Sequence, residues 1–219
     1  GFCLPFFNGA CGVGFVFSIR SVTSSSRDRG LGMNDDTWIS SRKEIEPERF
    51  HALGAMLLRW NSCETALFYL FLTVTGYGPD TAKALVHAMT EAALASRLRD
   101  LLTVHPIKPD EMHTATLYSL ELFNINRMNR NVYAHFLPTT GKDGMEFWRT
   151  DGPKFEARPI PNSLQDIRRT VEEMEACGEY IGAVGNRLVA LRMGWKPEPL
   201  PQKPRMPLRL WPRREGDTE

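Results

Sequence analysis

The sequence lacks the short motifs that mark the best-known enzyme chemistries. It contains no G-x-G-x-x-G, P-loop, G-x-S-x-G or H-E-x-x-H motif, so nucleotide-fuelled, α/β-hydrolase and zincin reactions lose their usual sequence support. Its five histidines include no H-x-x-x-H pair, which would place two ligands for zinc or a di-iron centre on one helix face. We therefore expect no bound metal and no other cofactor.

An excess of one charge is also missing, because 27 basic residues stand against 26 acidic ones. Bulk electrostatics favours neither a nucleic-acid coat protein nor a membrane-surface binder, and any nucleic-acid site has to be a local patch. The four cysteines lie far apart and form no C-x-x-C motif. Cys63 and Cys177 fall within apolar helical patterns, so we expect buried free thiols, which suit a reducing cytoplasm.

The first 32 residues differ in composition from the rest of the chain. Residues 1–18 are apolar but rich in glycine, and a Ser/Arg/Gly run follows them. No basic residue precedes the apolar part, as a signal peptide would require. A membrane anchor is the alternative, since about 18 apolar residues is the lower limit for a span. The glycines and Pro5 make a poor helix, so we expect residues 1–32 to be a disordered or non-native extension, with the natural protein starting at Met33 and not bound to a membrane.

Residues 33–193 carry the hydrophobic pattern of an all-α domain. Apolar residues recur in steps of three and four over residues 46–75, 80–104, 111–136 and 163–191. This spacing predicts an up-and-down bundle of four long helices, and a length of 219 residues with 42% hydrophobic residues fits one such domain. Ser163, with Asp166 three positions later, predicts the capped start of the fourth helix.

Two segments stand apart from the helices. Residues 139–162, between the third and fourth helices, predict a short β-hairpin insert with strands at 145–150 and 154–158 and a turn at 151–153. Residues 194–219 form a basic tail whose many prolines predict an extended, mobile chain. We expect this tail to be solvated, and the alternative is that it forms an accessory contact for an anion or a partner.

A carboxylate interrupts the apolar face of the first helix. The stripe on that helix consists of Phe50, Leu53, Leu57, Trp60, Glu64, Leu67, Phe71 and Val74. A buried carboxylate is costly unless it is paired or protonated, so Glu64 needs a partner. The alternative is that Glu64 leans to the edge of the stripe and reaches water.

Polar residues are concentrated at the end of the third helix. Arg127, Arg130, Asn131 and His135 lie in its last turns, and Asn131 and His135 share a face because they are four residues apart. The long side chain of Arg130 can swing its guanidinium toward the same side. Cations at a helix C-terminus are favoured by the helix dipole, so a purely structural role as caps is the alternative.

The segment RNVYAH at residues 130–135 resembles the motif of the HEPN superfamily, the helical domains of many prokaryotic RNase toxins and defence proteins. That motif is R-x(4–6)-H, often with Asn, Asp or His directly after the Arg, and Arg130, Asn131 and His135 match it position by position. The resemblance covers about residues 46–191. Leu137 stands where one HEPN subset has a Tyr two residues after the His, so the modification chemistry tied to that Tyr is not implied.

The resemblance implies a metal-independent endoribonuclease, of the kind that acts as a toxin or an antiphage effector. His135 would act as base or acid, Arg130 would hold phosphate oxygens, and Asn131 would orient the histidine or the phosphate. Arg127 is a second cation for the substrate. Glu64 is a candidate partner that positions Arg130 or Arg127.

HEPN proteins usually pair, so the resemblance also implies a homodimer whose third helices meet near His135. RNA is the expected substrate, and an antitoxin protein is a candidate partner. The alternative function is a non-catalytic HEPN-like bundle that serves as a dimerisation or RNA-binding adaptor. An open groove around Arg130, Asn131 and His135 favours the nuclease, whereas a buried and internally bonded His135 favours the adaptor.

Overall fold

The computed structural model describes residues 46–135, 137–141, 144–148 and 163–210, all of which belong to one compact unit, residues 42–219. For His135 and for the strand residues the description covers the backbone alone. The predictions for residues 1–32 and for the strand at 154–158 lie outside the described residues.

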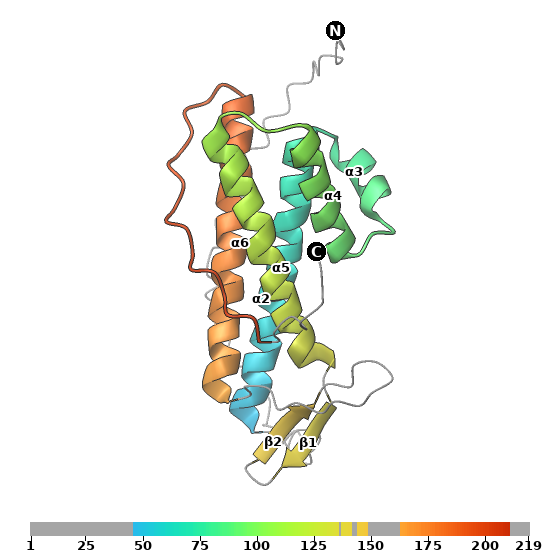
Figure 1. Cartoon of the computed structure of the whole chain (residues 1–219), viewed down its shortest axis with the longest axis vertical. Coiled ribbons are helices and arrows are strands. Elements are labelled where there is room, and N and C mark those ends of the chain that lie inside the picture. Colours follow the sequence, from blue (N-terminus) through green and yellow to red (C-terminus); the bar gives the residue numbers. More distant parts are fainter. Residues whose placement is uncertain (1–45, 136, 142–143, 149–162, 211–219) are drawn as a thin grey trace, which may run out of the picture. The chain divides into compact units, whose positions relative to one another are not determined.

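Five helices and one hairpin make up the described part of this unit (Figure 1). The helices are α2 (Pro47–Thr75), α3 (Pro79–Val86), α4 (Glu91–Val104), α5 (Asp110–His135) and α6 (Leu164–Arg192). The helical class is thus confirmed, and α2, α5 and α6 have nearly the predicted bounds. The predicted cap of α6 is confirmed as well, because Ser163 Oγ accepts a hydrogen bond from Asp166 N at 3.1 Å and the Asp166 carboxylate accepts one from Ser163 N at 3.2 Å.

The prediction of a single helix over residues 80–104 is wrong, because the helix is interrupted between Val86 and Glu91. Thr90 is the local cause. Its backbone is extended, with ψ 159°, and its hydroxyl accepts a hydrogen bond from Ala93 N at 3.2 Å. A threonine that bonds the backbone in this way stabilises the start of a helix rather than its interior. α3 and α4 are therefore two helices.

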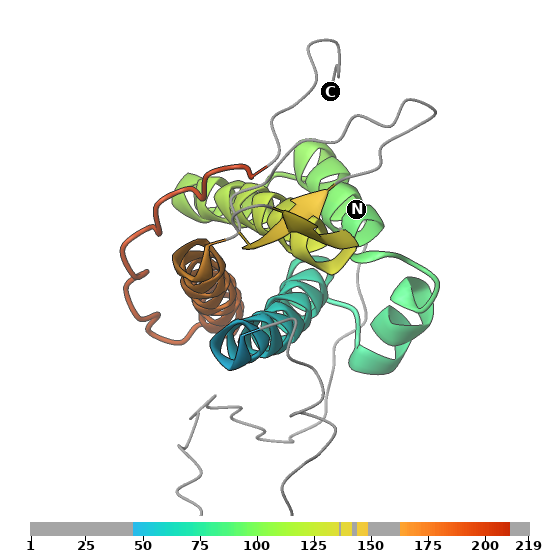
Figure 2. The same cartoon turned by 90° about the horizontal axis from the view of Figure 1, so that it is seen from below.

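Successive helices run in opposite directions (Figure 1). Because α3 adds one helix to the predicted series, the helices that are parallel to one another differ from those of the predicted bundle. α2, α4 and α6 point the same way, and α5 runs against them. Arg59 pairs with Glu175 at 2.8 Å and Arg192 Nη2 donates to the Val74 carbonyl at 3.5 Å, so α2 and α6 are parallel. Viewed along their axes, α2, α6, α5 and α4 form a ring of four neighbours (Figure 2). The predicted bundle is thus wrong in its count of helices, because α3 is a fifth helix beside this ring.

The core lies where α2, α5 and α6 meet. The rings of Trp60 and Phe123 pack with their centroids 4.9 Å apart. Cys63 and Cys177 are buried free thiols, as predicted, and Cys63 Sγ donates to the Met174 carbonyl at 3.0 Å. A hydrogen bond with Cys63 and burial raise the pKa of Cys177, so this thiol stays protonated at neutral pH.

Two members of the predicted α2 stripe are not in the core. Phe50 and Leu57 are exposed by 43% and 52%, whereas Met56 and Cys63 are buried. α4 first reaches α2 near Glu64, so it does not cover the earlier turns of α2. The apolar stripe was a sound sign of a helix, but it did not reveal how far the neighbouring helix extends.

A hairpin follows α5, as predicted, but with a different pair of strands. β1 (Leu137–Gly141) and β2 (Gly144–Trp148) are antiparallel, with Leu137 opposite Trp148 and Gly141 opposite Gly144. β2 corresponds to the strand predicted at 145–150. It pairs with β1, which precedes it in the sequence, whereas the predicted partner was the strand at 154–158.

Residues 194–210, called the tail below, are extended as predicted. The prediction that they are solvated is wrong, because Pro207 is buried and Leu200, Met206 and Leu210 pack against the core. Burial of apolar side chains holds this segment on the helices. Among the described residues, no helix is both long and apolar enough to cross a membrane.

The break between α3 and α4 leads to a stability prediction. Replacing Thr90 by Ala removes the acceptor for Ala93 N and should lower the free energy of unfolding by about 1 kcal/mol, as for other N-cap threonines. Urea denaturation followed by circular dichroism measures the change. Thr90→Ser keeps the hydroxyl and should stay close to the wild type. Equal stability of the Ala and Ser variants would contradict the role given to this cap.

Candidate functional site at the end of helix α5

Arg130 of α5 lies between two carboxylates from two other helices. Its Nη2 donates to Glu91 Oε1 at 2.8 Å and lies 3.9 Å from Glu64 Oε1. Glu91 is the first residue of α4, and Glu64 lies in the middle of α2. The Arg130 side chain is only 15% exposed. A guanidinium in this position needs such partners, because an unpaired charge inside a protein is strongly unfavourable.

An aromatic ring completes the surroundings of Arg130. Its Cζ lies 4.9 Å from the centroid of the Trp60 ring, a cation–π contact. Trp60 Nε1 in turn donates to Glu64 Oε1 at 2.8 Å, one turn further along α2. Trp60 and Glu64 therefore present a ring face and a carboxylate to the same guanidinium.

The two alternatives for Glu64, pairing with a cation and contact with water, both apply in part. It lies within ion-pair distance of Arg130, and its side chain is also 39% exposed. The nearer carboxylate is that of Glu91, which the sequence analysis missed. The sequence sign that could have revealed Glu91 is the Thr90-Glu91 pair, a capping threonine followed by an acidic residue. It lies inside a segment whose pattern predicts one helix.

Arg127 lies three residues before Arg130 and on the same side of α5. Asn131 follows Arg127 by one turn and lies about 100° round the helix from Arg130. Arg127 Nη2 donates to Asn124 Oδ1 at 3.1 Å. Burial lowers the pKa of Arg127; the charge of Glu91 opposes this shift, and the charge of Arg130 adds to it. Arg127 nevertheless remains a cation at neutral pH, because arginine starts from a very high pKa.

Three polar atoms in this part of α5 are buried without a hydrogen-bond partner. They are Arg127 Nε, Arg130 Nε and Asn131 Oδ1, which are two donors and one acceptor. Residues at i, i+3 and i+4 are neighbours on a helix surface. Buried polar atoms are usually bonded, and these three lie within about one turn of α5. Among the described residues, Arg49, Asn126, Tyr180 and Arg187 each carry a further buried polar atom without a partner.

His135 ends α5, one turn after Asn131. Its position on the helix is that expected from the motif, but its side chain lies outside the described residues. The structure thus brings Arg127, Arg130, Asn131 and Glu64 into one region. It leaves the approach of the imidazole to this region untested.

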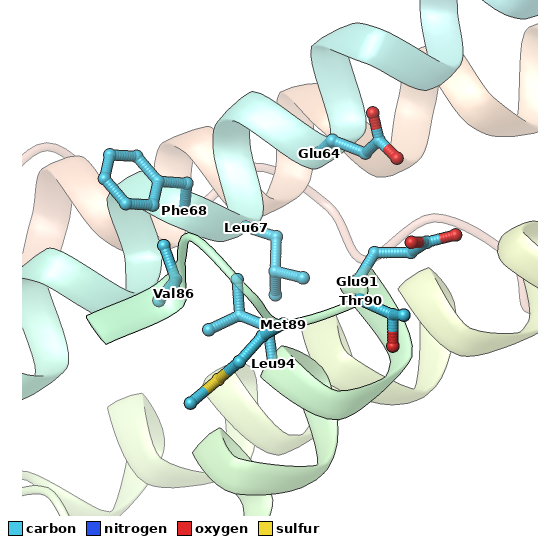
Figure 3. A pocket seen from close by; sticks show the side chains of 8 residues that line it. All are labelled: Glu64, Leu67, Phe68, Val86, Met89, Thr90, Glu91 and Leu94. Atoms are coloured by element: carbon cyan, nitrogen blue, oxygen red, sulfur yellow. The ribbon is translucent and has the colours of Figure 1, made fainter. Parts of the chain in front are cut away.

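A cavity of about 250 Å³ opens beside the two carboxylates (Figure 3). Its apolar lining consists of Leu67, Phe68, Val86, Met89 and Leu94. Glu64 and Glu91 lie at one end of it, and Phe68 and Met89 lie toward the other end. Glu64 and Glu91 line the cavity and also pair with Arg130, so the arginine lies next to the polar end of the cavity.

The arrangement has no net charge, since Glu64 and Glu91 balance Arg127 and Arg130. Both carboxylates approach Arg130 at Nη2, so neither of them occupies its Nε. An arginine held in this way has a fixed orientation and keeps donors for another acceptor. Within the residues that the structure describes, no group of three or more His, Cys, Asp or Glu side chains is arranged to hold a metal ion.

Comparisons of the chain with protein-family models, with curated proteins and with solved structures gave no match. The functional argument therefore depends on the residues and their geometry.

The contact between Arg130 and Glu91 can be measured by a double-mutant cycle. Arg130→Met and Glu91→Gln, alone and together, should give a coupling free energy of about 1 kcal/mol, less than for a fully buried charged hydrogen bond because both side chains are partly exposed. Urea unfolding of the four proteins provides the numbers. The matched cycle with Glu64→Gln should give a smaller coupling, because that carboxylate is 3.9 Å away. A larger coupling for Glu64 than for Glu91 would contradict the geometry.

Proposed function

We propose that the chain is a metal-independent endoribonuclease of the HEPN type, with its active site at the C-terminal end of α5. The observation that supports this most is the set of unbonded polar atoms on Arg127, Arg130 and Asn131. Two arginines and an asparagine within about one turn of α5 offer donors for the oxygens of a phosphodiester and an acceptor for a neighbouring hydroxyl group. Arg130 and Asn131 are also two of the three residues that resemble the HEPN motif, the third being His135.

The proposed reaction uses the nucleophile that RNA already carries. A base removes the proton of the 2′-OH, the oxygen attacks the adjacent phosphorus, and an acid protonates the leaving 5′-oxygen. His135 can serve in either role, because the pKa of an unperturbed histidine is near neutral. The products are a 2′,3′-cyclic phosphate and a free 5′-hydroxyl.

Arg130 would stabilise the charge that builds up on the phosphoryl oxygens during attack. Its orientation would be set by Glu91 and Glu64 on Nη2 and by the ring of Trp60. A donor that is already oriented needs no reorganisation as the transition state forms. Asn131 would orient His135 or the phosphate, and Arg127 would add a second cation for the RNA backbone.

The proposal includes a homodimer, because one chain supplies a single histidine to its site and the reaction needs both a base and an acid. Exposed apolar side chains on α2 support a further contact surface. Phe50, Leu57 and Leu58 are exposed by 43%, 52% and 69%, in the turns before Trp60. A second copy could cover them while bringing its own α5 near the first. An antitoxin protein that covers the same end of α5 would block the nuclease.

A second function is favoured by one specific observation. Arg130 is 15% exposed and its charge is already balanced by Glu91 and Glu64, so in this arrangement it also serves as a tie between three helices. If that is its whole role, the chain is a non-catalytic HEPN-like bundle acting as a dimerisation or RNA-binding adaptor. The adaptor would keep the ion pair and need no reactive histidine.

RNA cleavage distinguishes the two functions. The purified protein, incubated with 5′-labelled RNA in EDTA, should produce fragments that end in 2′,3′-cyclic phosphate. His135→Ala should lower the rate at least about 100-fold, as for the loss of a general acid or base. His105→Ala is the matched control, since His105 is exposed in the loop between α4 and α5, and it should cut like the wild type.

Cleavage that survives in the His135→Ala variant would exclude the assigned site. RNA binding without any cleavage by the wild type would favour the adaptor. Circular dichroism of each variant ensures that a lost activity is not a lost fold.

A further inference from the structure

The cavity beside Glu64 and Glu91 has free acceptors at its polar end. Both carboxylates approach Arg130 through Oε1, at 3.9 Å and 2.8 Å, and Trp60 Nε1 donates to Glu64 Oε1 as well. Among the described residues, the other oxygen of each carboxylate, Oε2, has no hydrogen-bond partner. The side chains of Glu64 and Glu91 are 39% and 27% exposed. Two carboxylate oxygens are therefore available to a ligand that carries hydrogen-bond donors.

A hydroxyl group lies at the same end of the cavity (Figure 3). Thr90, next to Glu91 in the sequence, lines the cavity, and its Oγ1 accepts a hydrogen bond from Ala93 N at 3.2 Å. A hydroxyl group that accepts a bond in this way still has its own hydrogen to donate. The polar end of the cavity thus offers two carboxylate acceptors and one hydroxyl donor.

The charges at this end favour a neutral ligand over an ion. Glu64 and Glu91 are the charged side chains that line the cavity, so they repel an anion. Arg130 lies within ion-pair distance of both carboxylates, and the charge of Glu91 also acts on Arg127, so the two carboxylates already have two cations. A cationic ligand would add a charge that nothing balances. The ligand that suits this end is neutral and carries donors.

The rest of the lining suits a small, flat ring system. Leu67, Val86 and Leu94 supply apolar walls, and Met89, which is 40% exposed, lies where a ligand can reach it from solvent. A methionine sulfur makes favourable contacts with aromatic rings. The volume of about 250 Å³ is smaller than the pockets that hold drug-sized ligands, which start at about 300 Å³. One heterocycle therefore fits better than a whole nucleotide.

Guanine has the hydrogen-bonding edge that this arrangement requires. Its N1–H and N2–H₂ groups are neighbouring donors, and the adjacent O6 is an acceptor. Adenine and cytosine each offer one amino group and uracil offers one N–H, so each of these bases leaves one of the two carboxylates without a donor. Proteins read unstacked RNA bases through this Watson–Crick edge and through the faces of the ring.

We propose that the cavity binds a guanine base, whose N1–H and N2–H₂ groups donate to Glu64 and Glu91 and whose O6 accepts from Thr90. The inference rests on the proposed function for the source of this base, which is a guanosine of the RNA substrate. Because Arg130 pairs with both carboxylates, a phosphate bound at its guanidinium would lie next to the base in the cavity. Glu64 and Glu91 would then both hold Arg130 and select the base.

Guanosine and inosine test the base site without any cleavage. The two nucleosides differ only in the N2 amino group, which inosine lacks. In protein labelled with 13C at the methionine methyl groups, the Met89 signal, assigned with a Met89→Leu variant, should shift as guanosine is added. The Kd for guanosine should be at least about tenfold lower than that for inosine, as for the loss of a hydrogen bond to a charged group. Equal Kd values, or a Met89 signal that guanosine leaves unchanged, would overturn the proposal.

Cleavage of RNA tests whether the base belongs to the substrate. A 5′-labelled RNA with a single guanosine should be cut next to that nucleotide, and inosine in its place should lower the rate there at least about tenfold. Met89→Trp places a larger side chain in the cavity and should remove this preference. Leu85→Trp is the matched control, because Leu85 is exposed by 47% and does not line the cavity, and it should keep the preference.

The results distinguish this inference from the proposed nuclease. Cleavage without a preference for guanosine, together with an unchanged Met89 signal, would overturn the base site and leave the nuclease unaffected. A Met89 signal shifted by guanosine in a protein that cuts no RNA would support the base site and contradict the nuclease. Guanosine binding together with cleavage next to every base would support a guanine site but overturn the RNA as the source of the base.

Discussion

The guanidinium of Arg130 joins α5 to both α2 and α4. It meets Glu91 at the first residue of α4, Glu64 in the middle of α2, and the face of Trp60. A cation that is mostly enclosed by protein is tolerated only when its partners are held in place. Those partners are held because Thr90 ends the preceding turn and starts α4 at this level of the bundle. The helix break at Thr90 therefore places Glu91 for its ion pair with Arg130. Together they set the orientation of Arg130 in the proposed site.

Neighbouring residues of α5 serve different faces of the same helix. Asn129 bonds the tail, whereas Arg130, next to it in the sequence, points to α2 and α4. Asn126 bonds the Leu122 carbonyl of its own helix from a fully buried position. The polar character of α5 thus has structural causes as well as a proposed chemical one. The functional proposal is based on Arg127, Arg130 and Asn131, three of the described residues that carry a buried polar atom without a hydrogen-bond partner.

Periodicity and capping residues were enough to place α2, α5 and α6, because each has a long apolar stripe and a clear beginning. They failed between residues 80 and 104, where no glycine or proline interrupts the alanine-rich pattern and only Thr90 signals the break. The tail was misread for another reason: its prolines exclude a helix but say nothing about docking. Its contacts join residues far apart in sequence, such as Asn129 and Leu208. The candidate site was found in part, since Glu64 follows from its place in an apolar stripe, whereas Glu91 depends on a break that the pattern hides.

The central claim is that Arg127, Arg130 and Asn131 bind the RNA backbone. NMR of the arginine side chains tests it directly, with 15N-labelled protein and an RNA oligonucleotide that is 2′-O-methylated and so cannot be cut. The Nε–H signals, assigned with Arg127→Lys and Arg130→Lys variants, should shift for both arginines as RNA is added, because a phosphate bound beside a guanidinium changes the environment of its Nε–H. If RNA saturates the protein while the Arg130 and Arg127 signals stay unchanged, these arginines have a structural role only and the site lies elsewhere.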